Sequence, residues 1–112
     1  MREKNHLLTQ NEVLVMLAIQ RRVRDAYGVS IRNEIEEQTK SRMSFGNLYS
    51  ILSRLEQDGL LTSREGEATP ERGGRAKRFF SFTGKGQRAL ANTLQSLDRM
   101  RGLSVALDGG LA

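Results

Sequence analysis

The chain has 112 residues, no cysteine, and a formal net charge of +5 from 18 lysines and arginines against 13 aspartates and glutamates. This length predicts one domain plus at most one further element, and the lack of cysteine excludes disulfides and thiolate metal sites. No stretch reaches the roughly 20 apolar residues of a membrane span, and the start lacks the apolar run of a signal peptide, so we expect a cytoplasmic protein.

A first helix is predicted over Thr9–Arg22. Thr9 followed by Glu12 fits a capping box, in which each side chain satisfies the backbone N–H of the other residue. The residues that follow, VLVMLAIQ, are apolar on most sides, which indicates a largely buried helix.

A second helix is predicted over Ala26–Thr39, because Tyr27, Ile31 and Ile35 recur at a spacing of four. Its other face is acidic and is interpreted as a solvated surface, carrying Glu34, Glu36 and Glu37. Such a face would repel a nucleic acid, so we expect this helix to face away from phosphates or to support the next one.

A third helix is predicted from an N-cap at Ser44 to a stop at Gly59. One broad apolar stripe has a period of 3.6 residues and consists of Phe45, Leu48, Ile51, Leu52 and Leu55. The opposite face is small or polar and consists of Gly46, Asn47, Ser50, Ser53, Arg54 and Gln57. Such side chains permit close approach to a duplex and hydrogen bonds to base edges.

A hairpin follows, with strands over Leu60–Glu65 and Arg75–Phe82 and a loop over Gly66–Gly74 that holds the only proline. Phe80 and Phe82 alternate toward a core, and Phe45 of the third helix is also interpreted as a core residue. Near the tip, four cations fall within seven positions without an acid between them, namely Arg72, Arg75, Lys77 and Arg78.

A fourth helix is predicted from Thr83 to Gly102. Leu90, Leu94 and Leu97 form a narrow apolar seam, which is more typical of an association surface than of a core face, although it could pack within its own chain. We therefore predict a DNA-binding domain over residues 1–82, a dimerisation helix over 83–103 and a disordered tail over 104–112.

The predicted order is three helices, two strands and a last helix. This order is typical of a winged helix-turn-helix, which is a mainly α fold (α+β) with a two-stranded wing. Within it, the third helix would enter the major groove of DNA while the basic wing tip contacts the neighbouring phosphates.

Three segments in chain order carry a family resemblance. They are Tyr27-Gly28 with Ile31 and Glu36-Glu37; Ser44 to Tyr49 with Leu52, Arg54-Leu55-Glu56 and Gly59-Leu60-Leu61; and Gly73-Gly74-Arg75 with Lys77, Phe79-Phe80, Thr83 and Gly86. Together they resemble the PadR family of bacterial transcriptional regulators, over about residues 9 to 100. The single C-terminal helix is similar to the short branch of that family.

The resemblance implies a homodimeric repressor that binds an inverted-repeat operator, with the C-terminal helix packed against the partner's N-terminal and C-terminal helices. It implies that Tyr49 lies near DNA phosphates and that a small-molecule effector releases the DNA. Some members stack a flat ligand between tryptophans, and this chain contains none. That binding mode is therefore not expected here.

Candidate DNA contacts follow from the residues. Asn47, Ser50 and Arg54 are candidates for groove contact, and Ser44 and Tyr49 for phosphate contact. Phosphate or minor-groove contact at the wing is predicted for Arg72, Arg75 and Lys77, whereas strand alternation could turn Arg78 to the opposite side.

Two other functions stay open: a winged-helix protein-interaction module without DNA binding, and an RNA-binding winged helix. Enzyme chemistry has no support, because the sequence has no phosphate-cradling glycine loop, nucleophile elbow or metal-ligand cluster. His6 is the single histidine, so we expect neither a metal site nor a cofactor.

Overall fold

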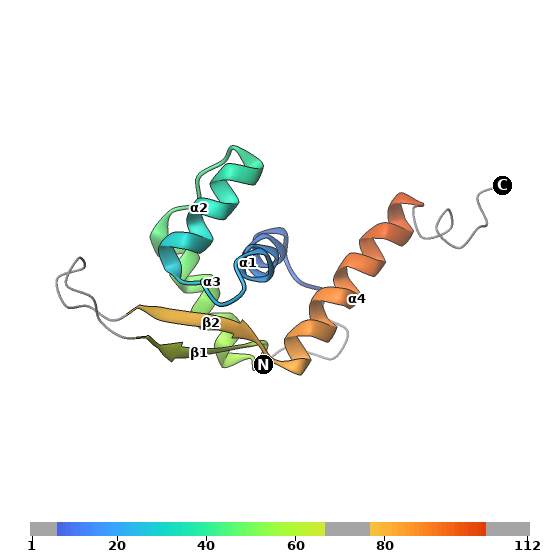
Figure 1. The fold of residues 1–112 in the computed structure, drawn as a ribbon. Helices are drawn as coiled ribbons and strands as arrows, with labels where there is room; N and C mark the ends of the chain where they lie inside the picture. Colours follow the sequence, from blue (N-terminus) through green and yellow to red (C-terminus); the bar gives the residue numbers. More distant parts are fainter. Residues whose placement is uncertain (1–6, 67–76, 103–112) are drawn as a thin grey trace.

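The computed structural model describes residues 7–66 and 77–102. Figure 1 shows a central α1, with α2 and α3 beside it, a two-stranded wing, and α4 projecting away from this body. The elements are α1 Gln10–Arg21, α2 Gly28–Thr39, α3 Phe45–Gln57, β1 Leu61–Glu65, β2 Arg78–Phe82 and α4 Gly84–Arg101. The predicted fold class, mainly helical with an antiparallel wing, is confirmed.

Side-chain caps set the starts of three helices where the sequence predicts them. The Thr9 hydroxyl accepts the backbone N–H of Glu12 at 3.2 Å, and the Glu12 carboxylate accepts that of Thr9 at 2.9 Å. The hydroxyls of Ser44 and Thr83 each accept the N–H three residues later, at 3.1 and 3.0 Å. These bonds satisfy N–H groups that have no partner within the helix. By contrast, α2 begins at Gly28 rather than at the predicted Ala26.

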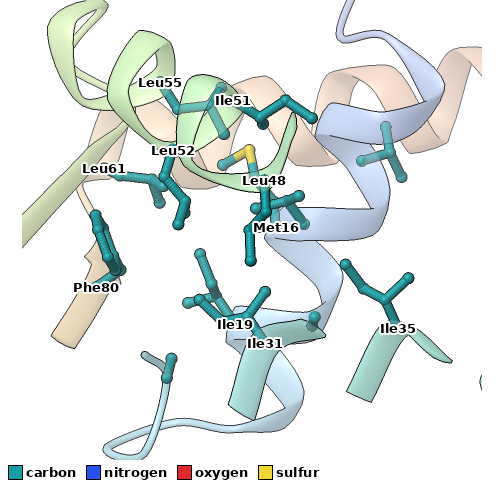
Figure 2. Packing of buried hydrophobic residues seen from close by; sticks show 14 of the residues in the cluster. Met16, Ile19, Ile31, Ile35, Leu48, Ile51, Leu52, Leu55, Leu61 and Phe80 are labelled. Carbon is teal, nitrogen blue, oxygen red and sulfur yellow. The ribbon is translucent and has the colours of Figure 1, made fainter. Parts of the chain in front are cut away.

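One apolar cluster joins α1, α2, α3 and the wing, as Figure 2 shows. Each of the three helices supplies side chains that are almost fully buried, among them Met16, Ile31, Leu48, Leu52 and Leu55. Burying one such side chain stabilises a fold by roughly 1.5–3 kcal/mol, so this cluster fixes the position of α3.

The wing is an antiparallel pair whose register runs from Leu61 opposite Phe82 to Glu65 opposite Arg78. The backbone N–H of Phe80 donates to the carbonyl of Ala26 at 2.8 Å, which attaches β2 to the connection between α1 and α2. β2 begins at Arg78, and the residues around the predicted start at Arg75 lie outside the described part of the chain.

Several contacts attach helix α4 to the body. Leu90 enters the core, and Gly86 lies so close to the backbone of Leu60 that an added Cβ would come within 2.9 Å of the Leu60 carbonyl carbon. Further along, the backbone N–H of Leu8 donates to the Thr93 hydroxyl at 3.1 Å. The far end of the helix projects away from the body (Figure 1).

The interpretation of Glu34 as part of a solvated face is wrong. Its side chain is 8% exposed and lies between Arg21 Nε at 2.5 Å and Arg22 Nε at 2.9 Å, and it accepts a third hydrogen bond from Gln38 at 3.1 Å. The hydrogen bonds from Arg21 and then from Arg22 lower the pKa of Glu34. The end of α1 and the middle of α2 are thereby joined by an ion pair.

Two apolar positions also differ from the expectation. Phe45 is 37% exposed, because it sits in the first turn of α3 at the margin of the apolar stripe. Leu90 is only 3% exposed within its own chain, so it is a core residue rather than a free dimerisation residue. Leu94 is partly buried against the core, and Leu97 remains 45% exposed.

Candidate nucleic-acid interface

The face of α3 that points away from the core carries small polar side chains. Ser44, Asn47, Ser50, Ser53 and Gln57 are all exposed. The apolar stripe on the other side of α3 is buried, so the helix is held firmly while this polar face stays open. Ser44, Asn47 and Ser50, three of the predicted contact residues, therefore lie together on one accessible surface.

Arg54 occupies a different position. Its Nε lies 3.5 Å from Glu12 Oε2, and Glu12 is only 2% exposed. A carboxylate buried in this way requires a charged or hydrogen-bonding partner, since desolvation alone would be unfavourable. The guanidinium of Arg54 is therefore directed toward the start of α1, although half of its side chain remains accessible.

An aromatic stack lies at the start of α3 and consists of Arg32, Phe45 and Tyr49. The Arg32 guanidinium carbon lies 4.2 Å from the centroid of the Phe45 ring, and its Nε donates to the carbonyl of Met43 at 2.8 Å. The Phe45 and Tyr49 rings are stacked with centroids 6.0 Å apart and an interplanar angle of 21°. Tyr49 is 48% exposed.

A second group, the wing-root cluster, consists of Tyr27, Arg64, Lys77 and Phe79. Tyr27 and Phe79 meet edge to face with ring centroids 5.6 Å apart. Lys77 Nζ lies 4.3 Å from the centroid of Tyr27, and the Arg64 guanidinium lies 4.9 Å from that of Phe79. Cation–π contacts hold both cations at the base of the wing while their charge remains available to an anion.

The remaining wing predictions have different outcomes. Arg72 and Arg75 lie outside the described residues. Arg78 donates to Ser63 at 2.9 Å and lies 3.4 Å from Glu65 on the neighbouring strand. Arg78 is therefore paired on the neighbouring strand, one position along from the Arg64–Phe79 pair.

The acidic character of α2 is partly neutralised by arginines. Glu36 pairs with Arg42 at 3.2 Å, and Glu34 is held between two arginines of α1 and its C-terminal cap. The predicted repulsion between α2 and an anionic partner is therefore weaker than the sequence indicated.

Tyr27, Arg32 and Arg64 are site residues that the sequence pattern does not indicate. A signal existed for the aromatic stack, because Phe45 and Tyr49 are four residues apart and such residues adjoin on a helix surface. Tyr27 and Arg64 reach the site through tertiary contacts with Phe79. Those contacts depend on the wing register, in which Arg64 stands opposite Phe79.

A groove of about 670 Å³ lies between the end of α1, strand β2 and α4. Its apolar wall includes Val23, Phe82, Leu90 and Leu94, and its polar residues are Gln20, Arg24, Arg64, Ser81 and Gln87. The groove is therefore formed jointly by the helical body, the wing and α4.

Within the described residues, no group of three histidine, aspartate or glutamate side chains is placed to hold a metal ion. Over the same residues, no helix combines the length and the apolar character that a membrane crossing requires.

Three helices, an antiparallel wing and an open polar face on the third helix define a winged helix-turn-helix protein. The chain belongs to the transcriptional regulator PadR-like family, because the match to that family covers residues 15–92, more than half of the sequence. The resemblance predicted from the sequence is confirmed, and with it the class of transcriptional regulator.

Solved structures agree with this assignment. A PadR-like transcription factor from Bacteroides fragilis matches with a TM-score of 0.70 and 25% identity, over 87% of this chain and 88% of that one. A PadR family transcriptional regulator from Eggerthella lenta matches with a TM-score of 0.62 and 25% identity, over 87% and 83% of the two chains. The complex structure of hsRosR-SG, at 22% identity, supports the fold alone, with a TM-score of 0.67 over 98% of both chains. No curated protein sequence matches the chain.

Proposed function

We propose that this chain is a sequence-specific DNA-binding regulator that acts as a homodimeric repressor in the cytoplasm. The observation that carries the proposal is the open polar face of α3 beside two groups of cations and aromatic rings. A helix with small polar side chains fits the major groove, and amide and hydroxyl groups hydrogen-bond to base edges.

In this proposal the contacts divide into two kinds. Asn47 and Ser50 contact base edges, whereas Ser44 and Tyr49 contact phosphates at the start of α3. Arg54 contributes to groove contact only after its guanidinium turns away from Glu12, so it is the weakest of the predicted contacts.

The wing supplies the other phosphate contacts, through Lys77 at its root and through Arg72 and Arg75 toward its tip. Each phosphate neutralised by a lysine or arginine releases counterions, so binding weakens as the salt concentration rises. We assign Arg64 to the same surface because its guanidinium lies over Phe79 in the wing-root cluster.

The proposed dimer forms through α4. Leu94 and Leu97 lie on its seam, and Met100, which is 85% exposed, extends the apolar surface toward the end of the helix. Val23 is 71% exposed at the end of α1 and offers a further apolar contact. A two-fold dimer would place two α3 helices in successive major grooves, roughly 34 Å apart, on an inverted repeat.

The proposed effector is a small molecule that binds in the groove between β2 and α4. A ligand there would contact both the wing and the dimerisation helix, and would favour the arrangement in which it binds most tightly. If that arrangement separates the two α3 helices by the wrong distance, the ligand releases the DNA.

The direct test is binding of the full chain to the DNA upstream of its own gene, measured by fluorescence anisotropy. We expect Asn47→Ala to weaken the specific duplex by roughly tenfold and to spare an unrelated duplex, since base contacts carry specificity. Lys77→Glu should weaken both duplexes and reduce the salt dependence, while Arg88→Glu, an equal charge change on α4, serves as the control.

Each rival function gives a different result. A folded dimer that binds no duplex at low salt would contradict the proposal and favour a protein-interaction module. Preference for RNA over duplex DNA in competition would favour an RNA-binding winged helix.

A further inference from the structure

Gly28, the first residue of α2, faces the aromatic ring of Tyr49 across the gap between α2 and α3. A Cβ added to Gly28 would lie 2.7 Å from Tyr49 Cζ and closer still to the hydroxyl oxygen. Real Cβ atoms essentially never come so near, so any side chain at this position would displace the phenol.

Backbone conformation does not explain this glycine. Among the described residues, the glycines with a positive φ are Gly59 and Gly102, and Gly28 is not one of them. Glycine also forms helices poorly, so a start to α2 at Gly28 has no local advantage over alanine. The reason that the structure offers is the space that Tyr49 occupies.

Tyr49 is confined on its other side as well. Its ring stacks on Phe45, which in turn lies beneath the guanidinium of Arg32. Arg32 is itself held by the hydrogen bond from its Nε to the carbonyl of Met43, in the turn between α2 and α3. The phenol is therefore fixed between the first turn of α2 and an aromatic stack that is anchored to the backbone.

The hydroxyl of Tyr49 has no hydrogen-bond partner among the described residues, although the ring is fixed and half exposed. A donor that is held in place on a half-exposed side chain, with no protein partner among the described residues, is suited to a ligand that approaches from outside. Fixing it before binding also removes the rotamer entropy that binding would otherwise cost.

We infer that Gly28 is a positioning residue for DNA recognition. Because Gly28 has no side chain, the phenol of Tyr49 can pack against it, with Phe45 and Arg32 on the other side of the ring. This position lets the Tyr49 hydroxyl meet a backbone phosphate. This inference rests on the proposed DNA-binding function and adds to it a residue that itself makes no contact with DNA.

The test is a double-mutant cycle measured by anisotropy on the upstream duplex. Gly28→Ala should weaken binding by roughly tenfold, the scale of one lost hydrogen bond to a charged group. In a Tyr49→Ala background the same change should have no further effect, because the phenol that it displaces is absent. Tyr49→Phe, which removes only the hydroxyl, should weaken binding to a similar extent.

Gly84→Ala is the matched control. Gly84 is likewise the first residue of its helix, but the nearest atom to an added Cβ is Arg88 Nη1 at an ordinary 3.5 Å. We expect this variant to bind DNA like the unaltered chain.

Two results would overturn the inference: unchanged binding by Gly28→Ala, or an equal loss for Gly28→Ala with and without Tyr49. Failure of the unaltered chain to bind any duplex would instead contradict the proposed function. In that case, nuclear Overhauser contacts between the Gly28 α-protons and the Tyr49 ring still test whether the ring packs against Gly28. Their absence would overturn the inference.

Discussion

The helical body and α4 bury their leucines to very different degrees. Leu48, Leu52 and Leu55 of α3 are almost fully buried in a core that α1, α2 and the wing share. On α4, Leu90 alone reaches comparable burial, and Leu97 and Met100 are 45% and 85% exposed. The leucines of α3 are thus buried within one chain, whereas the far end of α4 retains an exposed apolar surface.

This difference indicates that different residues determine the stability of a single chain and its association with a second copy. Substitutions in the body should change the free energy of unfolding of a single chain, and substitutions at the far end of α4 should change the association of the proposed dimer. Four substitutions, ordered from the largest expected effect on stability, test that separation.

The largest effect is expected for Leu52→Ala. Leu52 is 0% exposed, so the change removes buried methyl groups and leaves a cavity among α1, α3 and the wing. We expect the free energy of unfolding to fall by about 2–5 kcal/mol, measured by urea denaturation. Ser53→Ala, at an exposed neighbouring position, is the control. A loss of unfolding free energy below about 1 kcal/mol for Leu52→Ala would contradict close packing of the core around Leu52.

Gly86→Ala tests the junction between the two regions. An added Cβ would come within 2.9 Å of the carbonyl carbon of Leu60, and backbone atoms cannot yield as a flexible side chain can. We expect a loss of about 1–3 kcal/mol in thermal or urea unfolding, the usual range for overpacking. Gly84→Ala has room for its methyl group and should be neutral, so equal losses in the two variants would contradict the steric explanation.

Glu34→Gln tests the ion pair inside the body. Because Arg21 and Arg22 lower the native pKa of Glu34, its contribution to stability is present above the ordinary glutamate pKa and is lost as the pH falls through the lowered native value. The unaltered chain should therefore exceed the variant in stability at pH 7, and the difference should shrink below roughly pH 4.

The readout is urea denaturation across that pH range. Glu37→Gln, on the same helix but exposed, should show no such pH-dependent difference. If the difference in unfolding free energy between the unaltered chain and Glu34→Gln stays constant down to acid pH, the charged form of Glu34 is not its cause.

The smallest effect on stability is expected for Leu97→Ser. This substitution affects an exposed leucine, so the free energy of unfolding of the single chain should change by less than about 0.5 kcal/mol. Association should nevertheless weaken by at least about tenfold if α4 forms the dimer, measured by sedimentation equilibrium with Gln95→Ser as the control. Unchanged association would place the dimer interface elsewhere.

Local chemistry made much of the fold predictable. The caps at Thr9, Ser44 and Thr83 are bonds between near neighbours, and their residue types identify them without tertiary information. The apolar period placed the core face of α3 correctly at every position but Phe45, which the first turn of the helix leaves at the surface.

Long-range contacts explain what the sequence did not reveal. Glu34 looks solvated in the sequence because its partners, Arg21 and Arg22, belong to another helix. Arg54 likewise pairs with Glu12, which lies 42 positions earlier. A charged residue on a helical pattern predicts a surface only when no opposite charge from a distant segment meets it.

The contacts that hold α4 also limit how it can move. Gly86 abuts the backbone of Leu60, and the hydroxyl of Thr93 accepts the N–H of Leu8 two turns further on. Leu90, which is buried in the core between these two contacts, opposes rotation of the helix about its own axis, and the two outer contacts oppose a sideways tilt. A tilt of α4 away from the start of α1 would lengthen the Leu8–Thr93 hydrogen bond, and exchange of the Leu8 amide proton with solvent deuterium would report the loss of that bond.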